Sequence, residues 1–249
     1  MLGATPLALS LGLILEEGLS LDTLGRLLRS AAAAAARCGV AIVTGDTKVV
    51  ERGKADGLFM TTAGIGRIPP GLAIGPAAIR SGDAILVSGD LGRHGVAILA
   101  ARQELGFSTP LVSDLAPLHG SVQALLDAGL ELHALRDLTR GGLAAALHEL
   151  CRGAGLGGLV HEPVVPIHPA VAAACELLGL DPLTMANEGR FVLVLPAPQA
   201  PTALELLRQE NPSAAIIGRI EGQALLLETA LGVRRPLEPG RGEMLPRIC

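Results

Sequence analysis

The sequence is poor in aromatic residues: its 249 residues include three Phe and neither Trp nor Tyr. Proteins that bind single-stranded nucleic acid stack the bases on aromatic side chains, so that class is nearly excluded. The net charge is −4, and no excess of positive charge would attract nucleic acid or an anionic membrane surface. The composition therefore predicts no nucleic-acid partner and no membrane partner.

Hydrophobic runs of membrane-spanning length are also missing. The longest apolar stretch, AAAAAARCGVAIV, is interrupted by Arg37, whereas a spanning helix needs about 18 consecutive apolar residues or more. The first residues, MLGATPLALSLGLILEEG, lack the basic start of a secretory leader. We therefore expect a cytoplasmic protein, with enough hydrophobic residues for a sizeable core in one or two domains.

Cysteine is scarce, and Cys38, Cys151, Cys175 and Cys249 have neither a CxxC pair nor metal-ligand spacing. The first three are interpreted as small buried apolar residues. Cys249 is the last residue, and a prenylation signal is excluded because three residues would have to follow it. Its position alone leaves two interpretations open: an accident of where the chain stops, or a nucleophilic thiol that carries a chemical group.

The local sequence predicts alternating helices and strands. A helix begins at Ser20 or Asp22 and stops at Gly39, and extended segments follow around turns at Gly53 and Gly57. A stretch rich in Pro and Gly at residues 68–80 predicts a domain boundary. Further strands are expected at 83–89, within 130–137, and at 190–196, 214–220 and 224–229; further helices at 96–105, 118–129, 143–155, 169–179 and 202–211. The pattern predicts mixed α/β layers, an α+β fold.

The C-terminal stretch RRPLEPGRGEMLPRIC contains three Pro and two Gly and has no apolar periodicity. Such a sequence continues neither a helix nor a central strand, so residues 236–249 are predicted to be a mobile tail. Fully extended at ~3.3 Å per residue, this tail would reach on the order of 45 Å. It is long enough to carry Cys249 into a pocket.

The motif GDTKVV places an acid, a hydroxyl and a lysine at the end of a predicted strand. Asp46 has the carboxylate that magnesium prefers beside substrate phosphates, and Thr47 follows it. Lys48 can face phosphate or transfer a proton. A Gly-Asp turn with a solvated lysine explains the same residues equally well.

Two further motifs precede a helix and a strand. In DLTRGG, Asp137 and Arg140 stand beside Gly141 and Gly142, where backbone amides and a guanidinium would meet an anion at a helix start. A plain turn with a helix cap is the alternative. In ANEGRF, Glu188 precedes a buried strand, where a carboxyl of raised pKa would act as acid or base, unless it is only structural.

The glycine loop SGDLGRHG carries Asp90 and His94, and His94 is interpreted as a loop histidine. GxSxG, HExxH and a GxGxxG that opens a helix are all missing from the sequence. The serine hydrolase, zinc protease and dinucleotide-dependent dehydrogenase classes therefore have no support.

Seven stretches together resemble the HypE family of nickel–iron hydrogenase maturation proteins, in the PurM-like superfamily: LEEGL, GDTKVV, TTAGIG, SGDLGRHG, DLTRGG, ANEGR and the terminal PRIC. The resemblance implies three parts: an incomplete N-terminal ATP-binding and dimerisation domain over residues 1–70, a C-terminal α/β domain over 80–235, and the tail 236–249. It implies ATP and Mg²⁺ as cofactors, and a homodimer. The nucleotide site would use the GDTKVV and DLTRGG motifs, with Asp46 as the metal ligand.

The resemblance also implies a definite chemistry. In the family, the carbamoyltransferase HypF loads a carbamoyl group on the terminal cysteine, here Cys249. ATP activates the carboxamide oxygen, elimination leaves a thiocyanate, and the cyano group passes to iron on a HypC–HypD complex. Lys48 and Glu188 are the candidates for positioning the terminal group and moving protons.

One departure from the family concerns the start of the chain. Family members are usually longer at the N-terminus, so the first domain is expected to be incomplete, with exposed sheet edges and fewer magnesium ligands. This leaves a non-catalytic carrier or partner-binding homologue as one alternative. Another PurM-like enzyme, a selenophosphate or aminoimidazole ribonucleotide synthetase, is a further alternative, although such enzymes have no reason to end in a nucleophilic PRIC.

Overall fold

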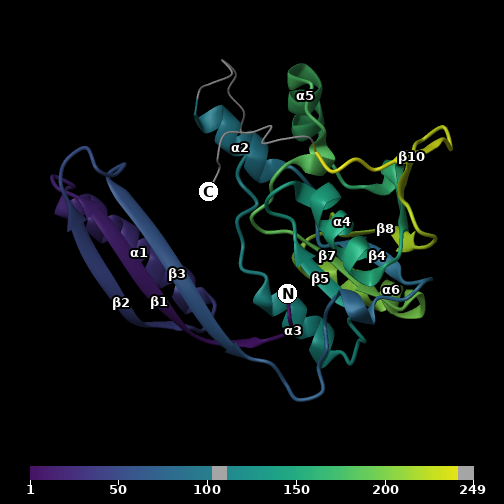
Figure 1. Ribbon diagram of the computed structural model, residues 1–249, viewed down its shortest axis with the longest axis horizontal. Helices are drawn as coiled ribbons and strands as arrows, with labels where there is room; N and C mark the ends of the chain where they lie inside the picture. The colour runs from purple at the N-terminus through teal and green to yellow at the C-terminus, as the bar shows by residue number, and fades with distance from the viewer. Residues whose placement is uncertain (103–110, 241–249) are drawn as a thin grey trace. The chain divides into compact units, whose positions relative to one another are not determined.

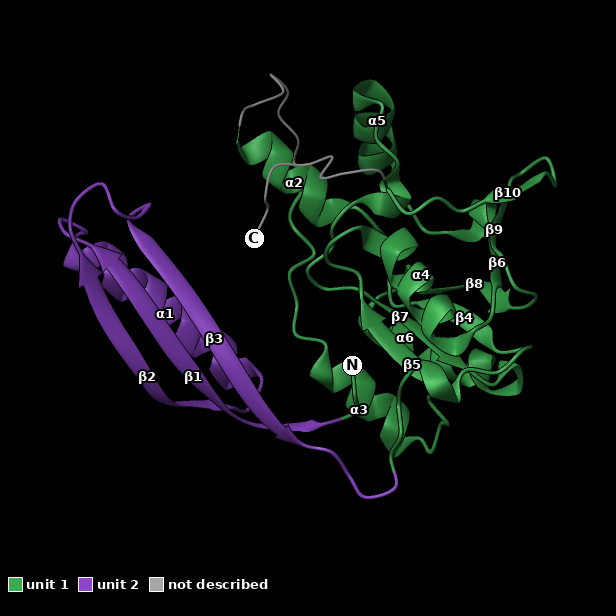
Figure 2. Cartoon of the chain, viewed as in Figure 1, with its two compact units in different colours: residues 1–3, 72–249 green, residues 4–71 purple. Residues whose placement is uncertain are grey.

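The computed structural model describes residues 1–102 and 111–240. The chain divides into two compact units, one of residues 4–71 and one of residues 1–3 and 72–249 (Figure 2). In the described ranges, none of the helices has the length and apolar character needed to cross a membrane.

The smaller unit is a three-stranded sheet with one helix (Figure 1). Strand β1 (Thr5–Glu16) is central; it runs parallel to β2 (Ala41–Val50) and antiparallel to β3 (Leu58–Arg67). Helix α1 (Leu21–Arg37) connects β1 to β2. Among the described residues, β2 and β3 are therefore the edges of this sheet.

The predicted first helix is confirmed, and its ends have the expected chemistry. The Ser20 hydroxyl accepts a hydrogen bond of 3.2 Å from the backbone N–H of Thr23, which caps the start of α1. After Arg37 the chain turns through Gly39, whose φ of 65° favours glycine. The two extended segments around Gly53 and Gly57 are β2 and β3, whereas the long strand β1 was not predicted.

Glu16, in the LEEGL motif, holds the turn between β2 and β3. Its carboxylate accepts hydrogen bonds from the backbone N–H groups of Gly53 at 2.6 Å and Gly57 at 3.1 Å. These bonds hold the pKa of Glu16 below its ordinary value. The acid at the end of β1 thus fixes the loop that follows the GDTKVV strand.

Gly45, the first residue of GDTKVV, is required by close packing between β1 and β2. A Cβ at this position would lie 2.1 Å from the carbonyl oxygen of Leu11 on the paired strand. Only a residue without a side chain fits there, so the glycine fixes the register that places Asp46 and Lys48.

We expect Gly45→Ala to destabilise the smaller unit by about 3 kcal/mol, because two backbones would have to separate. Gly64→Ala, on β3, is the control: its Cβ would lie 3.0 Å from the flexible end of Leu9, and the nearest backbone atom, the Ala8 carbonyl oxygen, would be at an ordinary contact distance of 3.9 Å. Chemical denaturation followed by circular dichroism measures both variants. Equal midpoints for the two would contradict the packing argument.

The larger unit contains a seven-stranded sheet in the order β10-β9-β6-β8-β4-β7-β5. Its strands are β4 (Ala84–Val87), β5 (Ala134–Asp137), β6 (Gly158–His161), β7 (Phe191–Leu195), β8 (Ala215–Ile220), β9 (Leu225–Glu228) and β10 (Arg234–Pro236). Its α-helices are α2 (Arg93–Ala101), α3 (His119–Asp127), α4 (Gly142–Ala154), α5 (Pro169–Leu178) and α6 (Ala200–Glu210). In the described part of this unit the connections include four short 3-10 helices: η1 (Pro76–Ala78), η2 (Glu162–Val164), η3 (Pro182–Thr184) and η4 (Ala197–Gln199).

The sheet of the larger unit has a hydrophobic core on each face. Strands β4 and β7 are buried at every residue, because helix α4 contributes to the core on one face and α3 and α6 to the core on the other. A third cluster joins α2 to α5 around Met185. The predicted mixed α/β layers are confirmed, and strands buried on both faces have the continuous apolar sequences that predicted them.

The C-terminal segment is folded further than its composition predicts. Pro236 ends the edge strand β10, a position that proline tolerates, and Leu237 is only 1% exposed. The predicted tail begins at Pro236, so its first two residues pack on the larger unit. Residues 241–249, including Cys249, lie outside the described part of the chain.

Candidate active site

Three of the motif loops meet at one end of the larger sheet. SGDLGRHG follows β4, DLTRGG follows β5, and ANEGR precedes β7. Strand β7 is antiparallel to both neighbours, with Val87 opposite Val192 and Asp137 opposite Phe191. The ends of β4 and β5 therefore lie beside the start of β7.

Asn187, of the ANEGR motif, ties the three loops together. Its Oδ1 accepts a hydrogen bond of 2.7 Å from the N–H of Gly92, and its Nδ2 donates to the carbonyls of Leu138 and Met185 at 3.1 and 3.0 Å. Its own N–H donates to Leu138 at 2.9 Å. The side chain is 1% exposed, so these bonds are made without competition from water.

Asp90, which is buried, and Arg190, which is partly buried, form an ion pair at the same end of the sheet. The Arg190 guanidinium donates to the Asp90 carboxylate at 2.9 Å and to the Asp90 carbonyl at 3.0 Å, and Arg93 also donates to the carboxylate. Burial opposes ionisation of Asp90, but the two arginines outweigh it and keep the pKa of Asp90 below its ordinary value. The pair fixes SGDLGRHG against ANEGR.

Asp114 holds the backbone on which Glu188 stands. Its carboxylate accepts hydrogen bonds from the N–H groups of Glu188 and Gly189, at 3.3 and 3.2 Å. A Cβ on Gly189 would lie 1.9 Å from the Asp114 carbonyl oxygen, so this position takes only glycine. Glu188 is half-buried on a backbone that cannot shift freely.

The DLTRGG loop is packed tightly against η3. Gly141 and Gly142 both have positive φ, 71° and 58°, and a Cβ on Gly142 would lie 2.5 Å from the Met185 carbonyl oxygen. Arg140 is exposed. Burial raises the pKa of Asp137, yet bonds from Thr139 and Arg136 outweigh it and the net pKa lies below the ordinary value.

His94 is buried at the start of α2, and its Nδ1 lies 2.8 Å from the hydroxyl of Ser113. The histidine of SGDLGRHG thus connects α2 to the loop that carries Asp114. The prediction of a loop histidine was wrong, because His94 is the second residue of α2.

In the smaller unit, Asp46, Thr47 and Lys48 occupy consecutive positions of β2. Alternation along a strand puts the carboxylate of Asp46 and the ammonium of Lys48 on one face and the Thr47 hydroxyl on the other. All three are exposed, and the Asp46 carboxylate accepts a 2.9 Å hydrogen bond from the N–H of Thr47.

The predicted site residues therefore fall into three groups. Asp137, Arg140, Gly141, Gly142 and Glu188 come together at one end of the larger sheet. Asp46, Thr47 and Lys48 stand on the smaller unit. Cys249 is outside the described residues. Within those residues no cluster of three His, Cys, Asp or Glu has the arrangement of a metal site.

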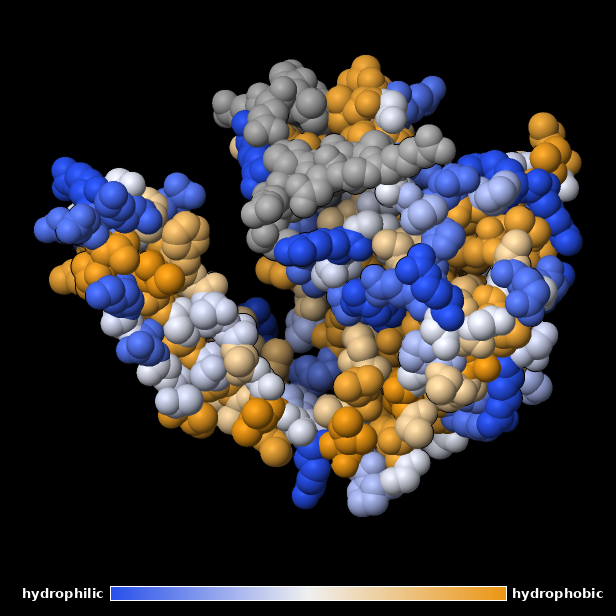
Figure 3. Space-filling view, in the orientation of Figure 1, coloured by the Kyte–Doolittle hydropathy of each residue, from blue (hydrophilic) through white to orange (hydrophobic). Residues whose placement is uncertain are grey.

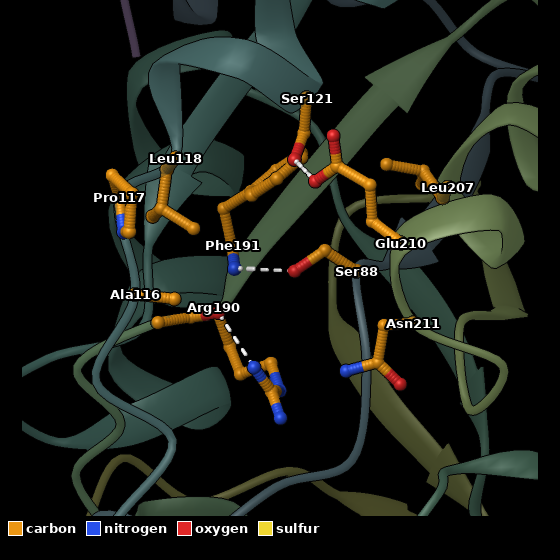
Figure 4. A pocket seen from close by; sticks show the side chains of 11 residues that line it. Ser88, Ala116, Pro117, Leu118, Ser121, Arg190, Phe191, Leu207, Glu210 and Asn211 are labelled. Carbon is orange, nitrogen blue, oxygen red and sulfur yellow. Dashed lines mark hydrogen bonds between the residues drawn. The ribbon is translucent and has the colours of Figure 1, made fainter. Parts of the chain in front are cut away.

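A cavity of about 100 Å³ lies beside the site, lined in part by Arg190, Ser88 and Asn211 (Figure 4). Ser121 donates a hydrogen bond to Glu210 across it, and the Ser88 hydroxyl accepts one of 3.0 Å from the N–H of Phe191. Ligand pockets commonly have about 300–1,000 Å³, so this cavity is too small for a nucleotide.

The remaining cysteines behave largely as predicted. Cys151 and Cys175 are buried, and burial raises the pKa of each thiol to about 11. Cys38 is half-buried. The two buried thiols are therefore almost fully protonated near neutral pH and react poorly.

Sequence reasoning missed Asn187, Asp114 and the pairing of Asp90 with Arg190. Three of these residues lie in motifs that were noted, but their partners are far away in sequence: Asn187 and Gly92 are separated by 95 positions. Asp114 lies in a loop without a motif, so no local signal identifies it.

Comparison with known proteins identifies the class to which this fold and site belong. The model of the AIR synthase related N-terminal domain matches residues 1–68, and that of the C-terminal domain matches residues 80–226. The chain is therefore an AIR synthase related protein with the PurM-like α/β fold.

Proteins with higher similarity to this chain identify the family within this class. Carbamoyl dehydratase HypE of Azotobacter vinelandii is 49% identical over 254 residues, which cover 100% of this chain and 74% of the relative. A crystal structure of the hydrogenase maturation protein HypE matches with a TM-score of 0.95 and 45% identity, covering 100% of this chain and 81% of the other. A HypE structure in complex with ATP matches at 0.94 and 44%, covering 100% and 77%.

The chain belongs to the HypE family of hydrogenase maturation proteins, as the resemblance of its motifs predicted. One further relative was solved as a HypE–HypF complex; it has a TM-score of 0.93 and 40% identity and covers 96% of this chain and 80% of that chain.

Proposed function

We propose that this protein is an ATP-dependent carbamoyl dehydratase that converts an S-carboxamide on Cys249 to a thiocyanate, a source of cyanide ligands for a nickel–iron hydrogenase. One observation carries the proposal: the described chain ends at Gly240 against Thr184, in the segment that packs on the DLTRGG loop. The cysteine-bearing end thus leaves the body beside the motif loops.

The reaction removes one water equivalent from the carboxamide. The C–O bond breaks, the oxygen leaves as phosphate, and the two N–H protons are lost as the C≡N bond forms. When bound, ATP would supply the phosphoryl group that makes the oxygen a leaving group, and Mg²⁺ would offset the charge of the ATP phosphates. The protein must hold the carboxamide in place and accept two protons.

Glu188 and Lys48 are assigned to these tasks. The carboxylate of Glu188 is half-buried on a backbone held by Asp114, a placement that suits a proton acceptor. Lys48 has an exposed side chain on β2 and would orient the terminal group or take part in proton transfer.

Asp46, Thr47, Asp137, Arg140, Gly141 and Gly142 are assigned to nucleotide binding. Magnesium usually takes one or two protein carboxylates together with substrate phosphates and water. The exposed Asp46 carboxylate accepts one described hydrogen bond, from the N–H of Thr47, and is a ligand of this type. Arg140 is exposed and has the fork of donors that suits phosphate.

The proposed partners are HypF, which would load the carbamoyl group, a HypC–HypD complex, which would receive the cyano group, and a second copy of this chain, all in the cytoplasm. The relative crystallised with HypF supports the first. Hydrophobic side chains are exposed on the smaller unit (Figure 3). Ile14, Phe59 and Ile65 are among them, and an exposed apolar strand face supports a dimer.

Mass spectrometry of the carbamoylated protein tests the proposal. With Mg-ATP we expect the C-terminal peptide to lose the mass of one water, because the carboxamide becomes a nitrile. Without ATP the mass should stay unchanged, since the amide oxygen is a poor leaving group. A protein that binds no Mg-ATP in calorimetry and shows no mass loss would instead be a non-catalytic carrier.

A further inference from the structure

His148, in the middle of α4, is bonded to the segment that leads to the tail. Its Nε2 lies 2.6 Å from the carbonyl oxygen of Leu237. A carbonyl can only accept, so this ring nitrogen carries the proton and donates it. No predicted site residue makes this contact, and the dehydration chemistry does not require it.

Leu237 is fixed by two more interactions. Its side chain is 1% exposed and belongs to the core cluster that also contains Leu143 and Leu147 of α4. Its N–H donates a 3.1 Å hydrogen bond to the carbonyl of Leu225, in β9. Both backbone polar groups and the side chain of Leu237 are therefore held by the folded unit.

From this point the chain runs along α4 toward the start of that helix. A Cβ on Gly240 would lie 3.1 Å from the side chain of Thr184. A Cβ on Gly142, the first residue of α4, would lie 2.9 Å from the Thr184 carbonyl carbon. Thr184 thus lies between the chain at Gly240 and the start of the helix.

The lengths agree with this path. From His148 back to Gly142 is six residues of helix, or about 9 Å at 1.5 Å per residue. From Leu237 to Gly240 is three residues of chain, or about 10 Å when extended. The described end of the chain therefore reaches the DLTRGG end of α4 by a nearly direct route.

We propose that His148 is a positioning residue that fixes the root of the C-terminal tail at Leu237, so that residues 237–240 direct Cys249 to the motif loops. This inference rests on the proposed dehydration of an S-carboxamide on Cys249. With Leu237 fixed, twelve residues, 238–249, separate the anchor from the end of the chain.

Releasing Leu237 would lengthen the tether, the chain between the folded unit and Cys249, and would remove the direction that the anchor at Leu237 gives it. If Leu237 and β10 both detached, the nearest paired residue would be Glu228 in β9, and the tether would grow from twelve to 21 residues. Effective concentration falls roughly as the −3/2 power of length, so length alone would lower it about twofold. The effective concentration of Cys249 at the site would fall further, because the tail would no longer start beside the motif loops.

Two assays separate positioning from a general structural role. In the tethered assay, conversion is followed on carbamoylated Cys249. In the second assay, an S-carboxamido peptide with the sequence of residues 241–249 is added to the full chain carrying Cys249→Ala. The peptide reaches the site by diffusion, so its conversion does not depend on the anchor.

We expect His148→Ala to lower the tethered rate about three- to tenfold, the range that one net hydrogen bond supports, and to leave peptide conversion unchanged. His148→Gln keeps a donor at similar reach and should stay within about twofold of the unsubstituted protein. His168→Ala is the control, because His168 caps α5 by accepting a hydrogen bond from the N–H of Ala170, a bond that does not involve Leu237. Amide hydrogen exchange at Leu237 should quicken in His148→Ala only.

Each other outcome overturns the inference. Equal losses in both assays would make His148 merely structural, and no loss in either would make the anchor irrelevant. If the unsubstituted chain converts neither Cys249 nor the peptide, the proposed function fails, and the positioning role falls with it. Exchange at Leu237 then still shows whether His148 holds the segment.

Discussion

A Cys249→Ala variant is expected to form no thiocyanate at all, even with Mg-ATP and a carbamoyl donor present. The carboxamide must be bonded to a sulfur that can be loaded and then presented to the site. A methyl side chain offers no nucleophile. The expected effect is therefore a complete loss of product, in contrast to the graded losses caused by removing a positioning contact.

The other thiols cannot take over this role. Cys151 and Cys175 are buried, with pKa values raised to about 11. At pH 8 about one thiol in a thousand would be ionised at each site, and the surrounding side chains exclude a carbamoyl donor. Cys38, half-buried at the end of α1, is the one described thiol with partial access.

Peptide mass mapping measures this prediction. Cys38→Ser is the matched control, since it removes the most accessible described thiol and should leave conversion intact. Carbamoylation or nitrile formation on a peptide other than the C-terminal one, in the Cys249→Ala variant, would contradict the mechanism.

Much of the larger unit could be predicted from local sequence. Strands β4 and β7 were predicted because each is a short apolar run with polar or turn residues beside it, the pattern of a strand buried on both faces. Helix α1 was predicted from a serine cap and a glycine stop, which are local signals. These elements depend on nearest neighbours along the chain.

Three strands were missed for a different reason. Strand β1 has alternating leucines, including Leu11 and Leu13, the buried pair of the strand, but this leucine-rich stretch was compared only with a secretory leader, which it does not resemble. Strand β10 has three residues, and β6 has only two large apolar residues, Leu159 and Val160, whereas the predicted β4 has three. Apolar runs this short give no local signal of a strand, and their pairing is set by their partners in the sheet.

The site shows the same division between local and distant information. The glycine motifs were visible, because glycine at a turn is a local requirement. The roles of Asn187 and Asp114 were not, because each depends on loops brought together by the sheet. Motifs thus locate the loops, and the long-range hydrogen bonds that fix them become known only from the fold.

Gly142→Ala is expected to have the largest effect on folding of the substitutions considered. Gly142 has a φ of 58°, which costs an alanine about 1–2 kcal/mol. Its Cβ would also lie 2.5 Å from the Met185 carbonyl oxygen and 2.7 Å from that of Leu183. Both are backbone atoms that cannot rotate away, so overpacking adds about 1–3 kcal/mol, for a total of about 2–5 kcal/mol.

Gly155→Ala, at the other end of the same helix, is the matched control. Gly155 has a φ of 66° and open space where the Cβ would stand. Gly155→Ala should therefore lower the free energy of unfolding only by the conformational cost of a positive φ, about 1–2 kcal/mol. The difference between the urea unfolding midpoints of Gly142→Ala and Gly155→Ala measures the contribution of packing at Gly142. Equal midpoints would contradict the predicted clash.

The two variants should also differ in activity while still folded. Relief of the clash at Gly142 moves η3 away from α4, and η3 carries Thr184, against which Gly240 packs. The route of the C-terminal segment and the DLTRGG loop would then shift together. Conversion of carbamoylated Cys249 by Gly142→Ala should fall more than tenfold below 20 °C, where the variant is still folded, because a misplacement of about 1 Å can cost 10²-fold. Gly155→Ala should retain conversion, because a Cβ at residue 155 would have no described heavy atom within 4 Å and so would displace none of the described surroundings.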